Sequence, residues 1–227
     1  MNSKVNKNVN KLENIKTIFF DFDGTVHDSI KIYAPAFRMA YKYLVENKFA
    51  EPKIWSEDEI SYWLGYSSKE MWKKFMPELV EEDKKACSKI IGSEMLTAIN
   101  EGRAELYDGA IEVLSYLKSK SYKLIFISNC GKYYMDSVNE YFRLDEYFSE
   151  MVCSERFNFI PKYEILNKIK NKYEGNMVII GDRVQDLEAG IKNSIYTIGC
   201  QYGFGLTDEL EKADLLINDI KELKNIF

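Results

Sequence analysis

Histidine and cysteine are scarce in this sequence, and neither is arranged as a metal site. The 227 residues include one histidine, His27, and four cysteines, Cys87, Cys130, Cys153 and Cys200, with no C-x-x-C pair among them. A structural zinc site needs cysteine or histidine ligands at short, paired spacings. The spacing therefore argues against zinc and against a disulfide framework, and it predicts single reduced thiols of the kind found in cytoplasmic proteins.

Long apolar runs and clusters of basic charge are also missing. No apolar stretch approaches the roughly 18 residues that span a bilayer, and the formal net charge is −5. Nucleic acids and anionic membranes bind clustered basic charge, so we expect neither as a partner. Residues 1–15 are basic and rich in asparagine but lack the apolar segment of a signal peptide. We expect a flexible N-terminal leader there, and a cytoplasmic protein.

The hydrophobic periodicity changes along the chain. Residues 17–20 form a short apolar strand, whereas residues from about 29 to 102 show the three-and-four spacing of amphipathic helices. Two capping boxes, which begin at Ser56 and Ser67, mark helix starts within that segment. From residue 109 onward, apolar strands alternate with helices, which indicates a parallel sheet covered on both faces. The sequence predicts an α/β fold, a Rossmann-like parallel sheet with inserted helices.

The same change of period predicts the domain organisation. The α/β core is expected at residues 16–28 and 104–227, and an all-helical cap domain at residues 29–103. After the first strand, further strands are expected at residues 122–128, 151–154, 177–181, 195–199 and 214–217. Helices are expected between them, including one at residues 162–173 and one at residues 187–193.

Polar residues are expected at one edge of this sheet, where the carboxyl ends of parallel strands bring loops together. They are four acids, one hydroxyl, one amide and one lysine: Asp21, Asp23, Ser128, Asn129, Lys162, Asp182 and Asp186. Oxygen ligands suit a hard cation such as Mg²⁺, which would offset the repulsion among the acids. A hydroxyl, backbone N–H groups and a lysine can spread the charge of a phosphoryl group. The sequence therefore predicts a site for phosphate and Mg²⁺.

The order of these residues resembles the haloacid dehalogenase superfamily of phosphohydrolases. The stretch DFDGT, Ser-Asn after the second strand, an isolated lysine and GDRVQD occur in the order of the family's motifs, from about residue 16 onward. The resemblance implies that Asp21 is the nucleophile that becomes an aspartyl phosphate. It also implies that Asp23 is the general acid that protonates the leaving oxygen and later the base that activates water.

The resemblance implies the roles of the remaining site residues as well. Mg²⁺ would be held by Asp21, by the backbone carbonyl of Asp23 and by Asp182, with Asp186 bound to the ion directly or through its waters. The transferring phosphoryl oxygens would be held by Ser128, Asn129 and Lys162, with Asn129 acting mainly through its backbone. One departure from the family is the order Pro161-Lys162, where members often carry Lys-Pro.

Within the superfamily, the chain resembles the phosphoglycolate phosphatase-like branch, with a helical cap. The stretch GDRVQDLEAGIKNSIYTIGCQYGFG at residues 181–205 carries this likeness. It implies a Mg²⁺-dependent phosphatase that hydrolyses a small phosphomonoester, similar to phosphoglycolate or a sugar phosphate. Tyr66 and Lys69, in the cap loop at residues 64–69, are the candidates for contact with the substrate. The expected partner is a small phosphorylated metabolite, and the expected state is a monomer or weak dimer.

Two other functions remain open from the sequence. A phosphomutase of the same superfamily, similar to β-phosphoglucomutase, would return the phosphoryl group to a sugar. A phospho-accepting signalling module also clusters acids, a hydroxyl and a lysine on an α/β sheet, but such modules are much shorter and lack a helical insertion. Specificity depends on the shape of the cap loops, so the sequence names neither the substrate nor the pathway.

Three residues beside these motifs have structural interpretations. His27 lies between Val26 and Asp28, and we expect a packing or solvent-facing role for it. Cys130 follows Asn129, and we expect a thiol without a catalytic role. Arg183 is expected to form a structural ion pair.

Overall fold

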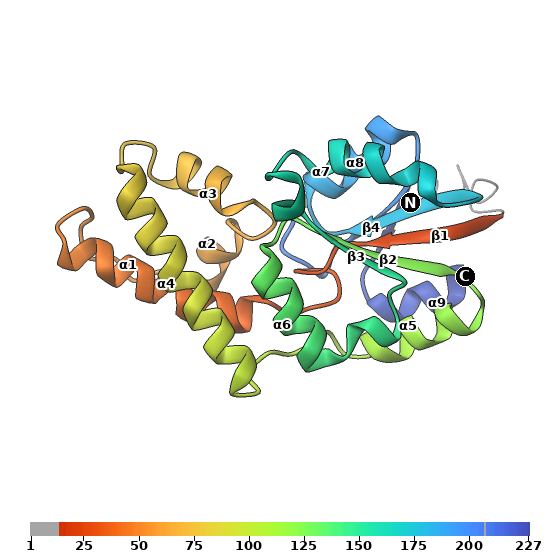
Figure 1. The fold of residues 1–227 in the computed structure, drawn as a ribbon, viewed down its shortest axis with the longest axis horizontal. Coiled ribbons are helices and arrows are strands. Elements are labelled where there is room, and N and C mark those ends of the chain that lie inside the picture. The colour runs from red at the N-terminus through yellow and green to blue at the C-terminus, as the bar shows by residue number, and fades with distance from the viewer. Residues whose placement is uncertain (1–13, 207) are drawn as a thin grey trace, which may run out of the picture.

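The protein folds around one six-stranded sheet in which every paired neighbour is parallel (Figure 1). The computed structural model describes residues 14–206 and 208–227, so most of the predicted leader lies outside the described residues. The strands are β1 (Ile15–Phe20), β2 (Lys123–Ser128), β3 (Glu150–Cys153), β4 (Asn176–Gly181), β5 (Tyr196–Cys200) and β6 (Leu215–Ile217). Their order is β3-β2-β1-β4-β5-β6. The predicted parallel sheet is confirmed, and β1 lies at its centre between β2 and β4.

Both faces of the sheet are covered by helices, which explains why the strands are apolar throughout. In β1, Ile18 and Phe20 belong to one core cluster, and Phe19 belongs to another on the opposite face. The first cluster includes residues of α5 (Ala110–Ser119) and α6 (Lys132–Phe142), and the second includes residues of α7 (Lys162–Ile169). Figure 1 shows α7 and α8 (Val184–Asn193) on one face and α5, α6 and α9 (Leu223–Ile226) on the other.

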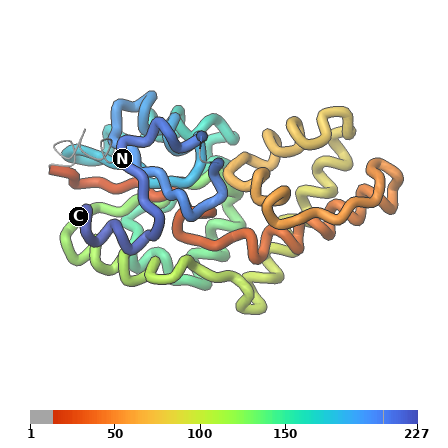
Figure 2. Tube along the Cα trace, turned by 180° about the vertical axis from the view of Figure 1, so that it is seen from behind, coloured from red at the N-terminus to blue at the C-terminus, as the bar shows by residue number. Residues whose placement is uncertain are grey.

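Four helices between β1 and α5 form a second cluster beside the sheet. They are α1 (Ile30–Glu46), α2 (Glu57–Ser61), α3 (Ser68–Phe75) and α4 (Glu81–Asn100), and Figure 2 shows them on one side of the α/β core. Their apolar faces meet in a separate core that includes Phe37, Leu44, Trp72 and Ile91. Both predicted capping boxes, at Ser56 and Ser67, are present. The inserted helices are therefore confirmed, whereas the domain limits at residues 29 and 103 stay a prediction.

Two helix boundaries differ from those expected. The helix expected at residues 162–173 ends at Ile169 and continues as the short 3₁₀ turn Lys170–Lys172. The helix expected at residues 187–193 begins earlier, at Val184. The reason is local: a carboxylate oxygen of Asp186 accepts a hydrogen bond from the Arg183 N–H at 3.0 Å, which satisfies a free donor at the helix start. Asp186 thus lies in the first turn of α8 and not in a loop.

Further 3₁₀ turns in the described part of the chain connect these elements, at Leu144–Glu146, Ser154–Phe157 and Ile220–Glu222. Within the described residues, no helix is long and apolar enough to cross a membrane.

Candidate active site

Three carboxylates meet at the carboxyl edge of the sheet. Asp21 follows β1, Asp182 follows β4, and Asp186 lies in the first turn of α8. All three are buried, and one carboxylate oxygen of each lies within 4.8 Å of the others. The Asp21 N–H donates to the Ile180 carbonyl at 2.9 Å, so β1 remains paired with β4 up to the point where its carboxylate is presented. The parallel register therefore brings together acids that are far apart in the sequence.

Lys162 is the cation bound to this cluster. As the first residue of α7, it directs its side chain back to the sheet edge, where it is 4% exposed. Its Nζ atom donates to Oδ1 of Asp21 at 2.6 Å and to Oδ1 of Asp186 at 2.5 Å. Burial lowers the pKa of Lys162, but Asp186 and Asp21 together outweigh burial and raise it. The lysine therefore remains charged.

One lysine does not balance three carboxylates. Burial, followed by the charge of Asp186, raises the pKa of Asp21 well above its usual range, although Lys162 opposes this shift. Burial and Asp186 also raise the pKa of Asp182 to about 7. Since repulsion and burial both disfavour the ionised forms, the cluster lacks positive charge. Its donors are carboxylate oxygens, the ligands that hard divalent cations prefer, so the residues fit a divalent metal ion.

The carboxylate of Asp182 is held in place by the loop after β1 and by the loop after β5. Its Oδ2 accepts from the Phe204 N–H at 2.6 Å, and its Oδ1 lies 3.5 Å from the Thr25 hydroxyl. Gly24 passes so close that a Cβ there would lie 2.2 Å from Oδ2 of Asp182, and its φ is +83°. Both the space and the backbone angle therefore require glycine in the DFDGT stretch.

Asp23 lies outside this cluster and has different partners. Its Oδ1 accepts from the Tyr134 hydroxyl at 2.5 Å and lies 3.1 Å from Nδ1 of His27. The Tyr134 hydroxyl is also 2.9 Å from Nδ1 of His27. Burial and the charge of Asp23 raise the pKa of Tyr134 well above its usual range, so the phenol keeps the proton that it donates.

His27 has the packing role expected of it and a polar contact that was not expected. The side chain is fully buried and stacks on Phe22, with ring centroids 5.0 Å apart. Its Nδ1 atom reaches Asp23 and Tyr134, while its Nε2 atom has no hydrogen-bond partner. An unpaired buried N–H is costly, so this arrangement favours the tautomer with the proton on Nδ1, where it has an acceptor.

Ser128 is the last residue of β2 and Asn129 follows it, so both lie at the carboxyl end of the strand, but their side chains have different surroundings. Ser128 is 3% exposed and lines the same cavity as Asp21 and Asp23. The Asn129 side chain donates to the backbone carbonyl of Gly65 at 2.8 Å, so it connects the sheet edge with the cap loop. This side-chain contact was not foreseen from the sequence.

Arg183 forms a second connection between the core and the cap loop. Its Nε donates to Glu209 at 3.0 Å, which confirms the expected ion pair. Its Nη1 donates to the backbone carbonyls of Tyr62, at 3.2 Å, and Leu64. The guanidinium also lies over the ring of Tyr66, 5.3 Å from its centroid. Arg183 therefore ties the cap loop to the start of α8.

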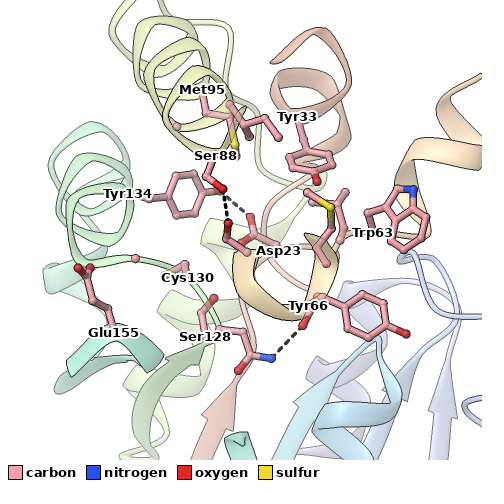
Figure 3. Close-up of a pocket in the computed structure, with 18 of the residues that line it drawn as sticks. Asp23, Tyr33, Trp63, Tyr66, Ser88, Met95, Ser128, Cys130, Tyr134 and Glu155 are labelled. Carbon is pink, nitrogen blue, oxygen red and sulfur yellow. Dashed lines mark hydrogen bonds between the residues drawn. The ribbon is translucent and has the colours of Figure 1, made fainter. Parts of the chain in front are cut away.

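A cavity of about 310 Å³ opens between the cap and the sheet edge. Figure 3 shows Asp23 near its centre, with Ser128 and Cys130 on the core side and Tyr33 and Met95 on the cap side. Tyr66 lines this cavity, and its contact with substrate stays a prediction. Lys69 is exposed and is not one of the lining residues, so its expected contact with substrate has no support in this geometry.

The Cys130 thiol is half-buried in the cavity wall. Burial, and next the charge of Asp23, raises the pKa of this thiol well above its usual range. A protonated thiol is a weak nucleophile, which agrees with the absence of a catalytic role expected for Cys130.

The chain is similar to several known proteins over nearly its whole length. Residues 18–200 match the family described as haloacid dehalogenase-like hydrolase. The phosphoglycolate phosphatase of Aliivibrio fischeri is 23% identical over 223 residues, which cover 93% of this chain and 96% of that protein. The matched residues include Asp21, Lys162 and Asp182, so the similarity spans the site.

Solved structures show the same fold. The crystal structure of a predicted phosphatase from Clostridium acetobutylicum has a TM-score of 0.78 at 23% identity, covering 93% of this chain and 97% of that one. A predicted phosphoglycolate phosphatase from Haemophilus somnus has a TM-score of 0.77 at 22% identity, with the same coverage. At this level of identity, the structural likeness establishes the architecture alone.

Proposed function

We propose that this chain, which belongs to the haloacid dehalogenase-like hydrolases and is a phosphatase of that family, hydrolyses a small phosphomonoester through a covalent intermediate on Asp21. The observation that carries the proposal is the buried contact of Lys162 with both Asp21 and Asp186, beside Asp182. A carboxylate approaches an anionic phosphate only where positive charge offsets the repulsion.

We propose Mg²⁺ as the divalent ion of the acid cluster. The carboxylates of Asp21, Asp182 and Asp186 would hold it, together with the backbone carbonyl of Asp23. Support comes from the oxygen-only donors and from the raised pKa of Asp182, which marks a charge deficit. When bound, the ion supplies positive charge to the phosphate and to the acids.

In the first step, a carboxylate oxygen of Asp21 attacks phosphorus, and the bond to the ester oxygen breaks. Lys162 and Ser128, with the backbone after β2, hold the phosphoryl oxygens. Asp23 gives its proton to the leaving oxygen. Its Oδ1 already accepts two contacts, from Tyr134 and His27, so the other oxygen, Oδ2, is the one that carries the proton.

In the second step, Asp23 accepts a proton from water, and the water oxygen attacks the phosphorus of the aspartyl phosphate. Inorganic phosphate leaves, and Asp21 returns to its free carboxylate. Dividing the displacement into two steps lets Asp23 serve as acid and then as base.

The cap and the cavity support a small substrate. The cap loop is tied to the core by Arg183 and Asn129, which limits the space over Asp21 to the cavity described above. We propose a small phosphorylated metabolite as the partner, with no role for nucleic acid or membrane. On sequence grounds, we also propose a cytoplasmic monomer or weak dimer, with a cap domain at residues 29–103.

The experiment is phosphate release from p-nitrophenyl phosphate and from a panel of phosphorylated metabolites, with Mg²⁺ present. Asp21→Asn removes the nucleophile without changing its size, and turnover should fall at least about 10³-fold. Asp136→Asn, which changes an exposed acid on α6, is the matched control. Excess EDTA should stop turnover, and added Mg²⁺ should restore it. Comparable turnover by Asp21→Asn would remove the nucleophile assignment.

A further inference from the structure

Beyond the acids, the cavity is lined mainly by apolar and aromatic side chains. The cap supplies Tyr33 from α1, Trp63 from the turn after α2, Met71 from α3 and Met95 from α4, and the core supplies Phe159. Figure 3 shows Tyr33, Trp63 and Met95 gathered on the cap side, opposite Ser128. The part of the substrate that leaves with the ester oxygen must lie among these side chains.

The charges in the cavity wall are all negative. Its ionisable acids are Asp21, Asp23 and Glu155, and none of the lining side chains in the described part of the chain is lysine, arginine or histidine. Lys162 does not line the cavity; it contacts Asp21, where the phosphoryl group of the substrate would bind. A carboxylate on the leaving group would therefore meet apolar groups, neutral hydroxyls such as those of Ser68 and Ser88, or another carboxylate, but no side-chain cation among the described lining residues.

The cations nearest the cap loop are directed elsewhere. Arg183 is bound to Glu209 and to the backbone carbonyls of Tyr62 and Leu64. The exposed Lys74 lies 5.2 Å from the centroid of the Tyr66 ring and is not a lining residue. Lys69, within the cap loop, is exposed and does not line the cavity, so none of these three cations is placed to bind an anionic group there.

Gly92 adds an independent observation about space. It lies inside α4 and lines the cavity, and a Cβ built there would meet nothing within 4 Å. Glycine inside a helix destabilises it relative to alanine, and close packing does not require glycine here. Its missing side chain enlarges the cavity on the cap side.

We propose that the leaving group of the substrate is an uncharged, largely apolar alcohol that carries a ring, and that it lies between α4 and the cap loop. This inference rests on the proposed phosphatase function and deepens it. An apolar ring gains by leaving water for these walls. A buried carboxylate without a cation is strongly disfavoured, so phosphoglycolate and other carboxylated esters are poor substrates.

A matched pair of esters measures the effect of a negative charge on the leaving group. Benzyl phosphate and 4-carboxybenzyl phosphate share the ring and the reacting oxygen and differ in one remote carboxylate. We expect kcat/KM for benzyl phosphate to exceed that for 4-carboxybenzyl phosphate by roughly 100-fold, and to exceed that for phosphoglycolate. A ratio below about tenfold for the matched pair, or a higher value for phosphoglycolate, would overturn the inference.

Substitution of Gly92 tests the placement of the ring. Gly92→Leu fills the space beside α4, so the ratio of kcat/KM for benzyl phosphate to that for the smaller acetyl phosphate should fall at least about fivefold. Ser93→Leu, on the exposed side of the same helix, should leave that ratio unchanged. An unchanged ratio in Gly92→Leu would show that the ring does not lie there and would overturn the placement.

The two proposals fail in distinguishable ways. Turnover of p-nitrophenyl phosphate that depends on Asp21, together with a preference for carboxylated esters, would overturn the substrate class and leave the phosphatase function standing. If no phosphate ester is hydrolysed in a manner that depends on Asp21, both proposals are wrong.

Discussion

The Nζ atom of Lys162 lies 2.6 Å from Oδ1 of Asp21, although 141 residues separate them in the chain. The same nitrogen also reaches Asp186, 2.5 Å away. The lysine thus joins the end of β1 with the start of α8. Among the described side chains that contact Asp21, it is the one that carries positive charge. In the proposed mechanism, its placement at the start of α7 offsets the repulsion between the Asp21 carboxylate and an anionic phosphate.

Lys162→Ala should lower kcat for p-nitrophenyl phosphate at least about 10²-fold, because the phosphoryl charge loses its cation. Lys168→Ala is the matched control, since Lys168 lies on the exposed side of the same helix. Steady-state kinetics on both variants, with circular dichroism to verify folding, makes the comparison. Equal activities in the two variants would contradict the role of Lys162.

Tyr134→Phe should impair proton transfer by Asp23, because one of the two contacts that orient the Asp23 carboxyl is lost. We expect kcat for benzyl phosphate to fall about tenfold. The loss for p-nitrophenyl phosphate should be smaller, since nitrophenolate leaves without a proton. Tyr141→Phe, also on α6, is the control. Equal losses for both esters would mean that Tyr134 does not act through Asp23.

The metal-free protein should lose stability as the pH rises. The pKa of Asp182 is raised from 3.8 to about 7 in the folded state, so the folded protein binds this proton more tightly than the unfolded chain. Its contribution is complete below about pH 4 and is lost as the pH rises through about 7, and it amounts to roughly 2 to 4 kcal/mol. Asp21 shifts in the same direction.

Urea unfolding in EDTA at pH 5, 6, 7 and 8 measures this effect. The difference in unfolding free energy between Asp182→Asn and the wild type should grow in favour of the variant as the pH rises, because asparagine carries no charge. Added Mg²⁺ should raise the stability of the wild type at pH 8. If the difference in unfolding free energy is the same from pH 5 to pH 8, the raised pKa of Asp182 in the folded protein is contradicted.

Arg183→Met should loosen the cap loop, because the carbonyls of Tyr62 and Leu64 lose their donor. We expect faster amide hydrogen exchange at residues 62–66 and a KM raised roughly 3- to 10-fold. Glu209→Gln removes the ion pair but leaves the contacts of Arg183 with the loop, so its effect on exchange should be smaller. If amide exchange at residues 62–66 is the same in both variants, the hydrogen bonds from Arg183 to Tyr62 and Leu64 do not stabilise the cap loop.

The sequence predicts the sheet and the position of the acids well, because both follow from simple geometry. Ile18, Phe19 and Phe20 are apolar on both faces of β1, as a covered central strand requires. Acids that follow parallel strands must lie at one edge, which is why Asp21 and Asp182 could be expected together. This prediction holds however many residues separate the two strands in the sequence.

The contacts of the cap and of Asp23 could not be predicted in the same way. Tyr134 reaches Asp23 because of the rotational phase of α6, which the pattern of apolar residues fixes only coarsely. Lys69 was expected in a loop beside the substrate, but α3 begins at Ser68, and its first turn directs Lys69 to the surface. The Asn129 side chain bonds a carbonyl of the cap loop, a partner that no motif specifies.

The most direct test is to locate the phosphoryl group during turnover. An acyl phosphate formed on an aspartate is reduced by sodium borohydride to homoserine, which peptide mass spectrometry can assign to one position. We expect homoserine at position 21 when the wild type is quenched during turnover of p-nitrophenyl phosphate with Mg²⁺, and none without substrate. Turnover at the same rate with no modified residue 21 at any quench time, or with the label at another aspartate, would contradict the covalent role of Asp21.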